Sequence, residues 1–166
     1  MTESIKAEDI SYRRFRVEDK VESLQKMIET ELSEPYSIYL YRHFAIDYPE
    51  LTIVAEHDNK IVGCILGKYE DNVKGNGRKP EDEEIHTPDT IKITGRKGYI
   101  AMIAVLPTYR KKNIGKHLVK LFLEESRNNN CDYVQLETEI CNIGALRLYE
   151  SRHILHRFRI CEDQAS

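Results

Sequence analysis

Tyr99-Ile-Ala-Met-Ile-Ala-Val-Leu-Pro-Thr-Tyr-Arg-Lys-Lys-Asn-Ile-Gly115 is the stretch of this sequence that decides the fold. Its first part, residues 99–106, is an apolar run that ends at Pro107, which predicts a central strand covered on both faces. Apolar residues then recur at three- and four-residue spacing over residues 114–122. This spacing predicts an amphipathic helix that begins near Asn113 and follows the strand after a short turn.

The turn between this strand and this helix is basic, with Arg110, Lys111 and Lys112 in a row. The first backbone N–H groups of a helix have no partner within the helix, and the helix dipole attracts negative charge to them. A phosphate or pyrophosphate group therefore suits this turn. An ordinary connection between a strand and a helix explains the same pattern, and the spacing alone favours this second interpretation.

Length and composition limit the class of protein. The chain of 166 residues is long enough for one domain with a core and too short for two, so we expect one domain over residues 1–166. With 40% hydrophobic residues, 32% charged residues and a net charge of -3, we expect a soluble protein that binds neither membranes nor nucleic acid. A polar, acidic N-terminus unlike a signal peptide favours a cytoplasmic location.

The cysteines and histidines give no sign of a metal site. Cys64, Cys131, Cys141 and Cys161 form no C-x-x-C pair, and the six histidines lack the spacing of metal ligands. We therefore expect reduced thiols and no bound metal.

Alternating and helical patterns elsewhere predict an α/β chain. Strands are expected at residues 10–16, 51–56, 61–69 and 132–138, and helices at 21–32, at 38–48 and from Asn142 onward. The polar segment 70–97 is expected to be a long flexible loop. In such a sheet ligands bind at the carboxyl ends of neighbouring strands, which leads us to expect Val105, Arg110 and Glu137 close together.

The basic turn also matches a family signature. Residues 110–115 resemble the Arg/Gln-x-x-Gly-x-Gly/Ala acyl-CoA motif of the Gcn5-related N-acetyltransferase (GNAT) superfamily, with Asn113 in place of the first glycine. Asparagine is the residue other than glycine that best tolerates a left-handed backbone, so the turn is expected to survive with some loss. The resemblance implies the GNAT acyl-CoA N-acyltransferase fold, an α/β (α+β) arrangement in which helices flank a mixed, mostly antiparallel central sheet.

Further segments narrow the resemblance. Several segments are similar to the catalytic subunits of NatC N-terminal acetyltransferases of the fungal type. They are residues 32–39, 98–105 and 131–139, followed by Asn142 and residues 148–150. The resemblance implies direct acetyl transfer from acetyl-CoA, in a ternary complex, to nascent chains that begin with Met and a hydrophobic residue. It also implies NatC auxiliary subunits and the ribosome as partners.

The resemblance assigns roles to particular residues. An α-amino group has a pKa of about 7.7–8, so a modest general base is enough to deprotonate it. The resemblance implies that Glu137 is this base and that Tyr149 protonates the leaving thiolate. A surface carboxylate and a core tyrosine are the plainer alternatives for these two. The residues expected to contact acetyl-CoA are Met102, Ile103, Ala104, Val105, Arg110, Lys111, Lys112, Asn113, Ile114, Gly115, Lys116 and Asn142. The residues expected to line the peptide site are Leu32, Glu34, Pro35, Tyr36, Tyr39 and Glu139.

The end of the sequence departs from the family. Where the family continues with Gly-Phe and a hairpin that closes over the peptide, residues 151–166 contain neither, so we expect an altered or truncated C-terminus. This tail supports one alternative function, an inactive chain that binds acetyl-CoA but lacks the hairpin. A lysine or small-amine acetyltransferase of the same fold is a second alternative.

Overall fold

A mixed sheet of six strands, in the order β1-β2-β3-β4-β5-β6, organises the chain. The computed structural model describes residues 9–16, 18–19, 21–29, 37–72, 95–137 and 160–161, and for residues 72, 137, 160 and 161 it describes the backbone. The strands are β1 Ser11–Arg14, β2 Thr52–His57, β3 Lys60–Asn72, β4 Gly95–Val105, β5 Tyr133–Glu137 and β6 Ile160–Cys161. Neighbours from β1 to β4 are antiparallel, whereas β4–β5 and β5–β6 are parallel. The predicted mixed, mostly antiparallel sheet is confirmed.

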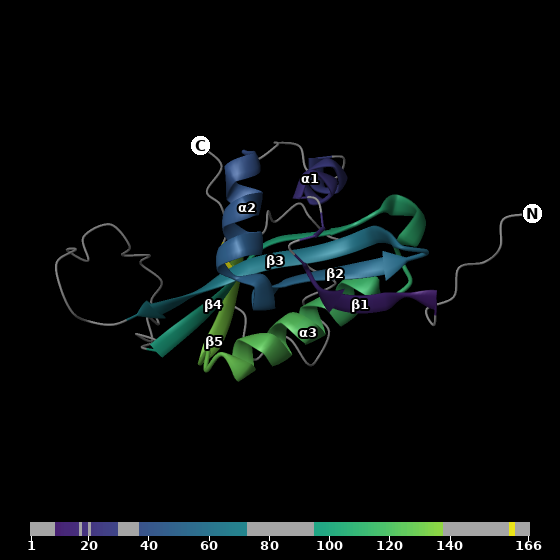
Figure 1. Ribbon diagram of the computed structural model, residues 1–166. Helices are drawn as coiled ribbons and strands as arrows, with labels where there is room; N and C mark the ends of the chain where they lie inside the picture. The colour runs from purple at the N-terminus through teal and green to yellow at the C-terminus, as the bar shows by residue number, and fades with distance from the viewer. Residues whose placement is uncertain are drawn as a thin grey trace, which may run out of the picture.

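Helices cover both faces of this sheet. Figure 1 shows α1 and α2 on one face and α3 on the other. The helices are α1 Val21–Glu29, α2 Ile38–Asp47 and α3 Ile114–Asn128, and two short 3-10 helices, η2 Pro49–Leu51 and η3 Pro107–Tyr109, precede β2 and α3. The predicted start of a helix near Asn113 is confirmed.

Each face of the sheet has its own hydrophobic core. On the α3 side, Phe122 and Leu118 pack with Ile65 of β3. On the other side, Leu24 of α1 and Tyr41 of α2 pack over β3 and β4. Burying one such side chain contributes about 1.5–3 kcal/mol. The sheet is thus covered twice, as the apolar run of β4 predicts.

The hairpin of β3 and β4 is longer than predicted. Residues 70–72 and 95–97, which the sequence assigned to a loop, pair with each other at the end of this hairpin. Cross-strand ion pairs hold them, because Lys97 Nζ lies 3.3 Å from Glu70 Oε2 and Arg96 Nε lies 2.6 Å from Asp71 Oδ1. A search for apolar alternation misses strand ends that are stabilised by charge pairs. Residues 73–94 lie outside the described residues.

A β-bulge interrupts the pairing of β3 with β4. Leu66 pairs with Met102 but Gly67 pairs with Ile100, so Ala101 is an extra residue in β4. The bulge changes which side chains face which helix. Ile100 belongs to the core on the α3 side, while Met102 belongs to the core under α1 and α2.

Gly67 makes this bulge sterically possible. A Cβ atom built on Gly67 would lie 2.2 Å from the carbonyl oxygen of Tyr99 and 2.5 Å from the ring of Phe122. The backbone of β4 and the helix α3 therefore approach β3 at a point where no side chain fits.

Other predictions concern absent features and the C-terminal part. Among the described residues no helix is long and apolar enough to cross a membrane. In the same part of the chain, no three His, Cys, Asp or Glu side chains gather as a metal site would require. Cys64 and Cys131 are free and buried, and burial raises the pKa of the Cys64 thiol. The helix predicted from Asn142 lies outside the described residues, as does the tail apart from β6.

Candidate functional site

Among the described residues, the second half of β4 has an open edge. Parallel pairing of β4 with β5 stops at Ile100 and Leu136, whereas β4 continues to Val105 on its pairing with β3. The Leu106 N–H donates to Val62 O at 2.9 Å, which fixes which residues of β4 bond to β3. Since bonding residues alternate in an antiparallel ladder, Ile103 and Val105 direct their backbone groups away from β3. Within the described chain no strand pairs with them there.

The four residues of β4 that were predicted to contact acetyl-CoA, Met102 to Val105, direct their backbone groups in two opposite directions. Met102 and Ala104 bond to β3 and bury their side chains under α1 and α2. Ile103 and Val105 have backbone groups directed to the open edge, where the Val105 carbonyl already accepts a hydrogen bond from Arg110 Nε at 3.2 Å. A linear polar ligand would meet two residues of β4 at this edge.

The basic turn, residues 110–113, contains two left-handed residues. Asn113 has φ 61° and ψ 11°, and Lys111 has φ 60°. The expectation that Asn113 supports the turn in place of glycine is confirmed. Lys111 in the same region is strained, because a left-handed backbone brings the Cβ of an ordinary residue too close to its carbonyl. This conformation folds the turn tightly at the beginning of α3.

The start of α3 offers donors to an anion. The first hydrogen bond within the helix runs from His117 N–H to Asn113 O at 3.0 Å, and Asn113 makes no side-chain cap. The amides of Ile114, Gly115 and Lys116 therefore point out of the helix end without a capping side chain. The side chains of Arg110, Lys111 and Lys116 are exposed beside it.

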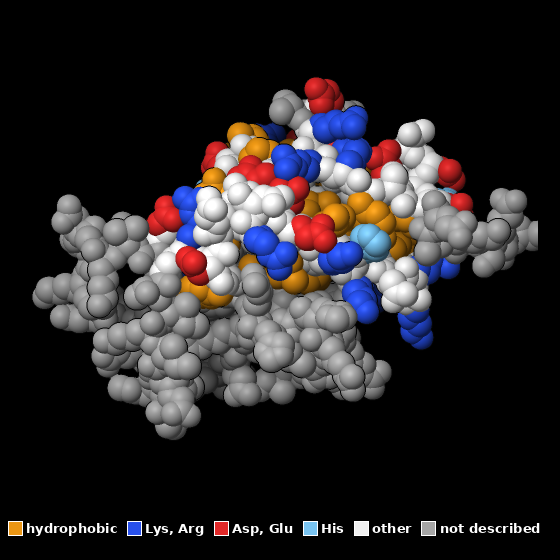
Figure 2. Space-filling model, turned by 90° about the horizontal axis from the view of Figure 1, so that it is seen from below, with side chains coloured by type: hydrophobic (Ala, Val, Ile, Leu, Met, Phe, Trp, Pro, Cys, Tyr) orange, Lys and Arg blue, Asp and Glu red, His pale blue; other side chains and the backbone are white. Residues whose placement is uncertain are grey.

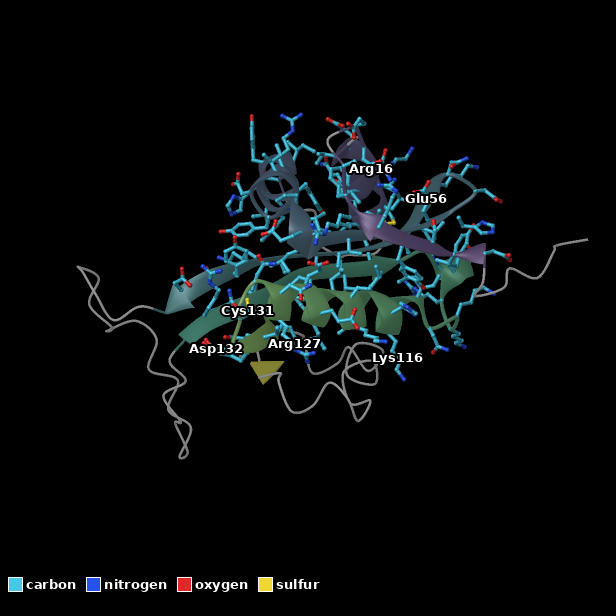
Figure 3. The ribbon with its side chains drawn as sticks, turned by 60° about the horizontal axis from the view of Figure 1, so that its bottom comes forward. Arg16, Glu56, Lys116, Arg127, Cys131 and Asp132 are labelled. Carbon is cyan, nitrogen blue, oxygen red and sulfur yellow. The ribbon has the colours of Figure 1, made fainter. Side chains whose placement is uncertain are left out.

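Two views place this charge on the α3 side of the molecule. Figure 3 shows Lys116 near the start of α3 with its side chain directed away from the sheet, and Arg127 near the other end. On the face that Figure 2 shows, Lys and Arg side chains are interspersed with Asp and Glu. Among the side chains coloured by type, this face has no broad surface of one charge.

Glu137 lies at the other end of the open edge. It is the last residue of β5, and the register of β4 and β5 continues from Ile100 opposite Leu136, so its backbone lies level with Ala101. Val105 is four residues further along β4, or about 13 Å at 3.3 Å per residue. The structure therefore brings Arg110 and Val105 together, but Glu137 is at a distance from them. Within the described residues β5 ends at Glu137, whereas β4 continues to Val105.

Only part of the predicted peptide site lies in the described chain. Tyr39 is in the first turn of α2, its N–H donates to Ser37 Oγ at 3.3 Å, and its side chain is 76% exposed. The other residues predicted for catalysis, for the cofactor and for the peptide, namely Tyr149, Asn142, Leu32, Glu34, Pro35, Tyr36 and Glu139, lie outside the described residues. These assignments remain predictions.

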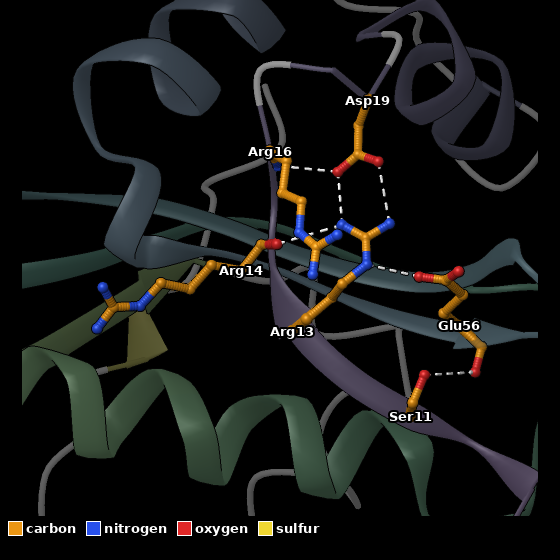
Figure 4. Close-up of polar contacts among 6 residues, drawn as sticks. All are labelled: Ser11, Arg13, Arg14, Arg16, Asp19 and Glu56. Atoms are coloured by element: carbon orange, nitrogen blue, oxygen red, sulfur yellow. Dashed lines mark hydrogen bonds and ion pairs between the residues drawn. The ribbon is translucent and has the colours of Figure 1, made fainter.

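A polar network fixes the start of α1, the helix that leads to residues 30–36. Arg13 of β1 donates through Nη1 and Nη2 to both carboxylate oxygens of Asp19, at 2.6 and 2.9 Å, and through Nε to Glu56 at 2.5 Å (Figure 4). The Arg16 N–H donates to Asp19 as well, at 2.8 Å. The hydrogen bonds from Arg13 hold the pKa of Asp19 below its usual value. Bidentate pairs of this kind set orientation as well as charge.

Sequence reasoning missed the two residues that shape the edge. Ala101, the bulge residue, is one of several small or apolar residues in its strand, and nothing local distinguishes it. Gly67 carries a usable signal, because a glycine inside a strand pattern indicates a bulge or a close backbone approach.

Comparison with known proteins places these features in a family. A profile of the Acetyltransferase (GNAT) family matches residues 19–153, which include β4, the basic turn and α3. N-alpha-acetyltransferase 30 of Xenopus laevis is 39% identical over 142 residues, and the match covers 86% of this chain and 45% of the frog protein. N-alpha-acetyltransferase 30 of Saccharomyces cerevisiae is 36% identical over 152 residues, covering 88% of this chain and 75% of the yeast protein. This chain thus spans less than half of the frog relative's length.

A solved structure gives the same result for the fold. A chain in the crystal structure of the NatC complex bound to Gag peptide and CoA superimposes with a TM-score of 0.69 at 35% sequence identity. The match covers 86% of this chain and 82% of that chain. Both the fold and the sequence therefore agree with one family of proteins.

Proposed function

The chain belongs to the acetyltransferase (GNAT) family, and from this premise we propose that it transfers the acetyl group of acetyl-CoA to the α-amino groups of proteins, with a NatC-type preference for Met followed by a hydrophobic residue. The observation that carries the proposal is the open edge of β4, which ends in a left-handed basic turn and an uncapped helix start. This edge supplies backbone donors along a line, and the turn supplies donors and positive charge at its end.

The residues present fit acetyl-CoA as co-substrate. The amides of Ile114, Gly115 and Lys116 would hold the pyrophosphate, with Arg110, Lys111 and Lys112 supplying positive charge and Asn113 the turn. Ile103 and Val105 would bond to the pantetheine arm, and an amide N–H of this edge would donate to the thioester carbonyl oxygen. Met102 and Ala104 would support the edge by packing. Asn142 would bond to the same arm.

The chemistry needs a base and an acid. Glu137, whose backbone lies level with Ala101 of β4, would take the proton from the ammonium group of the acceptor, directly or through a water. The free amine then attacks the thioester carbonyl carbon, the C–S bond breaks, and Tyr149 would give its proton to the departing thiolate. The nitrogen loses its second proton as the amide forms, and this proton would return to Tyr149 through water. The acetyl group supplies the reactive carbonyl, and the protein supplies position and proton transfer.

The acceptor and the partners follow from the same premise. Leu32, Glu34, Pro35, Tyr36, Tyr39 and Glu139 would line the peptide site. Auxiliary subunits of a NatC-type complex and the ribosome would bring nascent chains to it in the cytoplasm. The similarity to N-alpha-acetyltransferase 30 and to a chain of the NatC complex supports this assignment.

Three acceptors test the proposal. The purified chain is incubated with acetyl-CoA and a peptide that begins Met-Leu, one that begins Ser, or one that has a blocked N-terminus and a lysine, alone and with auxiliary subunits. We expect acetylation of the Met-Leu peptide above the other two. Acetylation of the lysine peptide alone would favour the lysine acetyltransferase. Calorimetric binding of CoA with no transfer under either condition would favour the inactive chain.

A further inference from the structure

We propose that His57 is a positioning residue for acetyl-CoA, because it holds Tyr109 and, through Tyr109, the turn that leads from β4 to α3. This inference rests on the proposed function, in which that turn carries the pyrophosphate. His57 is the last residue of β2 and Tyr109 the last of η3. His57 Nδ1 lies 3.1 Å from the phenol oxygen of Tyr109, and the two rings meet edge to face with centroids 5.5 Å apart.

The hairpin of β2 and β3 fixes the position of the His57 backbone. β2 and β3 are joined by a two-residue turn, Asp58 and Asn59, with φ 47° and 60°, and His57 pairs with Lys60 across it. Two-residue turns with positive φ match the twist of the strands they join. The side chain of His57 is 17% exposed, and its Nδ1 also lies 3.5 Å from Asp58 Oδ2, so the ring lies between this turn and Tyr109. Figure 1 shows the turn after β4 beside the tip of the β2–β3 hairpin.

Tyr109 connects this support to the anion-binding amides. The turn is closed internally by Tyr109 N–H to Leu106 O at 2.8 Å and by Arg110 Nε to Val105 O at 3.2 Å. Leu106 ties its beginning to β3, through Val62, and His57 ties its end to β2. Lys111, two residues after Tyr109, is the first of the two residues with positive φ in the basic turn. A turn held at both ends has less freedom to lose when it binds an anion.

Replacing His57 tests this role. In His57→Ala we expect the KM for acetyl-CoA to rise about three- to tenfold, the range for one lost hydrogen bond, with kcat and the peptide KM within about twofold. His57→Asn places a polar atom where Nδ1 lies and should restore the affinity, whereas His57→Gln places one where Nε2 lies and should not. Tyr109→Phe, which removes one oxygen, should behave as His57→Ala, and the double variant should be no worse than either.

Two readouts separate positioning from a general loss of structure. In His57→Ala, amide hydrogen exchange should quicken over residues 107–116 and stay unchanged in β3 and α1. His43→Ala is the matched control, because His43 bonds to Asp47 at 2.6 Å on α2, away from the turn. We expect His43→Ala to keep both the affinity and the exchange rates of the unaltered protein.

The outcomes distinguish this inference from the proposed function. If the unaltered chain binds no CoA by calorimetry, the proposed function and this inference both fall. If it binds CoA and His57→Ala binds equally well, or if kcat falls while the KM stays constant, the role of His57 alone is refuted. Failure of His57→Asn to restore affinity that His57→Ala loses would refute it as well.

Discussion

Asn113 and Lys111 have nearly the same φ, 61° and 60°, but different reasons to tolerate it. Asparagine visits the left-handed region readily, whereas lysine does so at a cost of roughly 1 kcal/mol. The turn therefore has one residue suited to its backbone and one that is strained. Strain of this kind persists at binding sites where the surrounding structure enforces it.

Substitutions at these two positions should act in opposite directions. Lys111→Gly should raise the free energy of unfolding by about 0.5–1 kcal/mol because it relieves the left-handed strain, and Asn113→Ala should lower it by about 1 kcal/mol. Urea denaturation measures both. Equal effects of the two variants, or destabilisation by Lys111→Gly, would show that the turn has another conformation in solution.

Gly67 acts at the scale of the element, because it sets how closely β3, β4 and α3 approach. Gly67→Ala should destabilise the protein by about 3 kcal/mol, since its Cβ would meet the Tyr99 carbonyl oxygen at 2.2 Å, a backbone atom that cannot turn aside. Gly63→Ala is a matched control in the same strand, with nearest contacts of 3.3 Å. It should cost about 1 kcal/mol or less. Similar unfolding midpoints for the two variants would argue against the bulge at Ala101.

The link between β1 and α1 should depend on pH. Because the pKa of Asp19 is lower in the folded chain than its usual value, the folded state binds fewer protons than the unfolded state, and the carboxylate stabilises the fold at neutral pH. This contribution is present above the usual aspartate pKa of about 4 and is lost as the pH falls through it toward the lowered value. Asp19→Asn should therefore cost about 1–2 kcal/mol at pH 7 and progressively less below pH 4.

Glu22→Gln is the control for this prediction. Glu22 pairs with Arg42 at 3.3 Å, but both side chains are largely exposed, at 62% and 49%. Such a pair contributes about 0.5 kcal/mol or less. Urea denaturation at pH 7 and pH 3.5 compares the variants. A cost of Asp19→Asn that is the same at both values would contradict the assigned pair with Arg13.

The sequence predicts some elements better than others, for physical reasons. The strand and helix of residues 99–128 are visible because apolar periodicity, a proline and a basic turn follow each other in one continuous stretch. The bulge at Ala101 and the contact of His57 with Tyr109 depend on register and on residues 52 positions apart, which no local pattern encodes. The end of the β3–β4 hairpin was missed because ion pairs, not apolar alternation, hold it.

At the scale of the whole molecule, the two ends of the open edge should contribute differently to catalysis. Glu137→Gln should lower kcat by about 100-fold or more with little change in the KM for acetyl-CoA, since a general base acts in the transition state. Glu124→Gln, on the exposed face of α3 with Lys120 at 3.9 Å, should leave both constants unchanged. Steady-state kinetics give kcat and the KM for acetyl-CoA in both variants. A normal kcat in Glu137→Gln would remove Glu137 from the role of base.

In the sheet as a whole, the edge of β4 proposed to bind acetyl-CoA lies beside the end of β5, and we propose that an α-amino group is acetylated there. The most direct test uses one peptide that begins Met-Leu and also contains a lysine, so that two amines compete in one molecule. Tandem mass spectrometry after incubation with acetyl-CoA locates the added acetyl group. We predict acetyl on the α-amino group of Met and none on the lysine. Acetyl on the lysine, or no acetyl on either amine with auxiliary subunits present, would show that this chain does not acetylate protein N-termini.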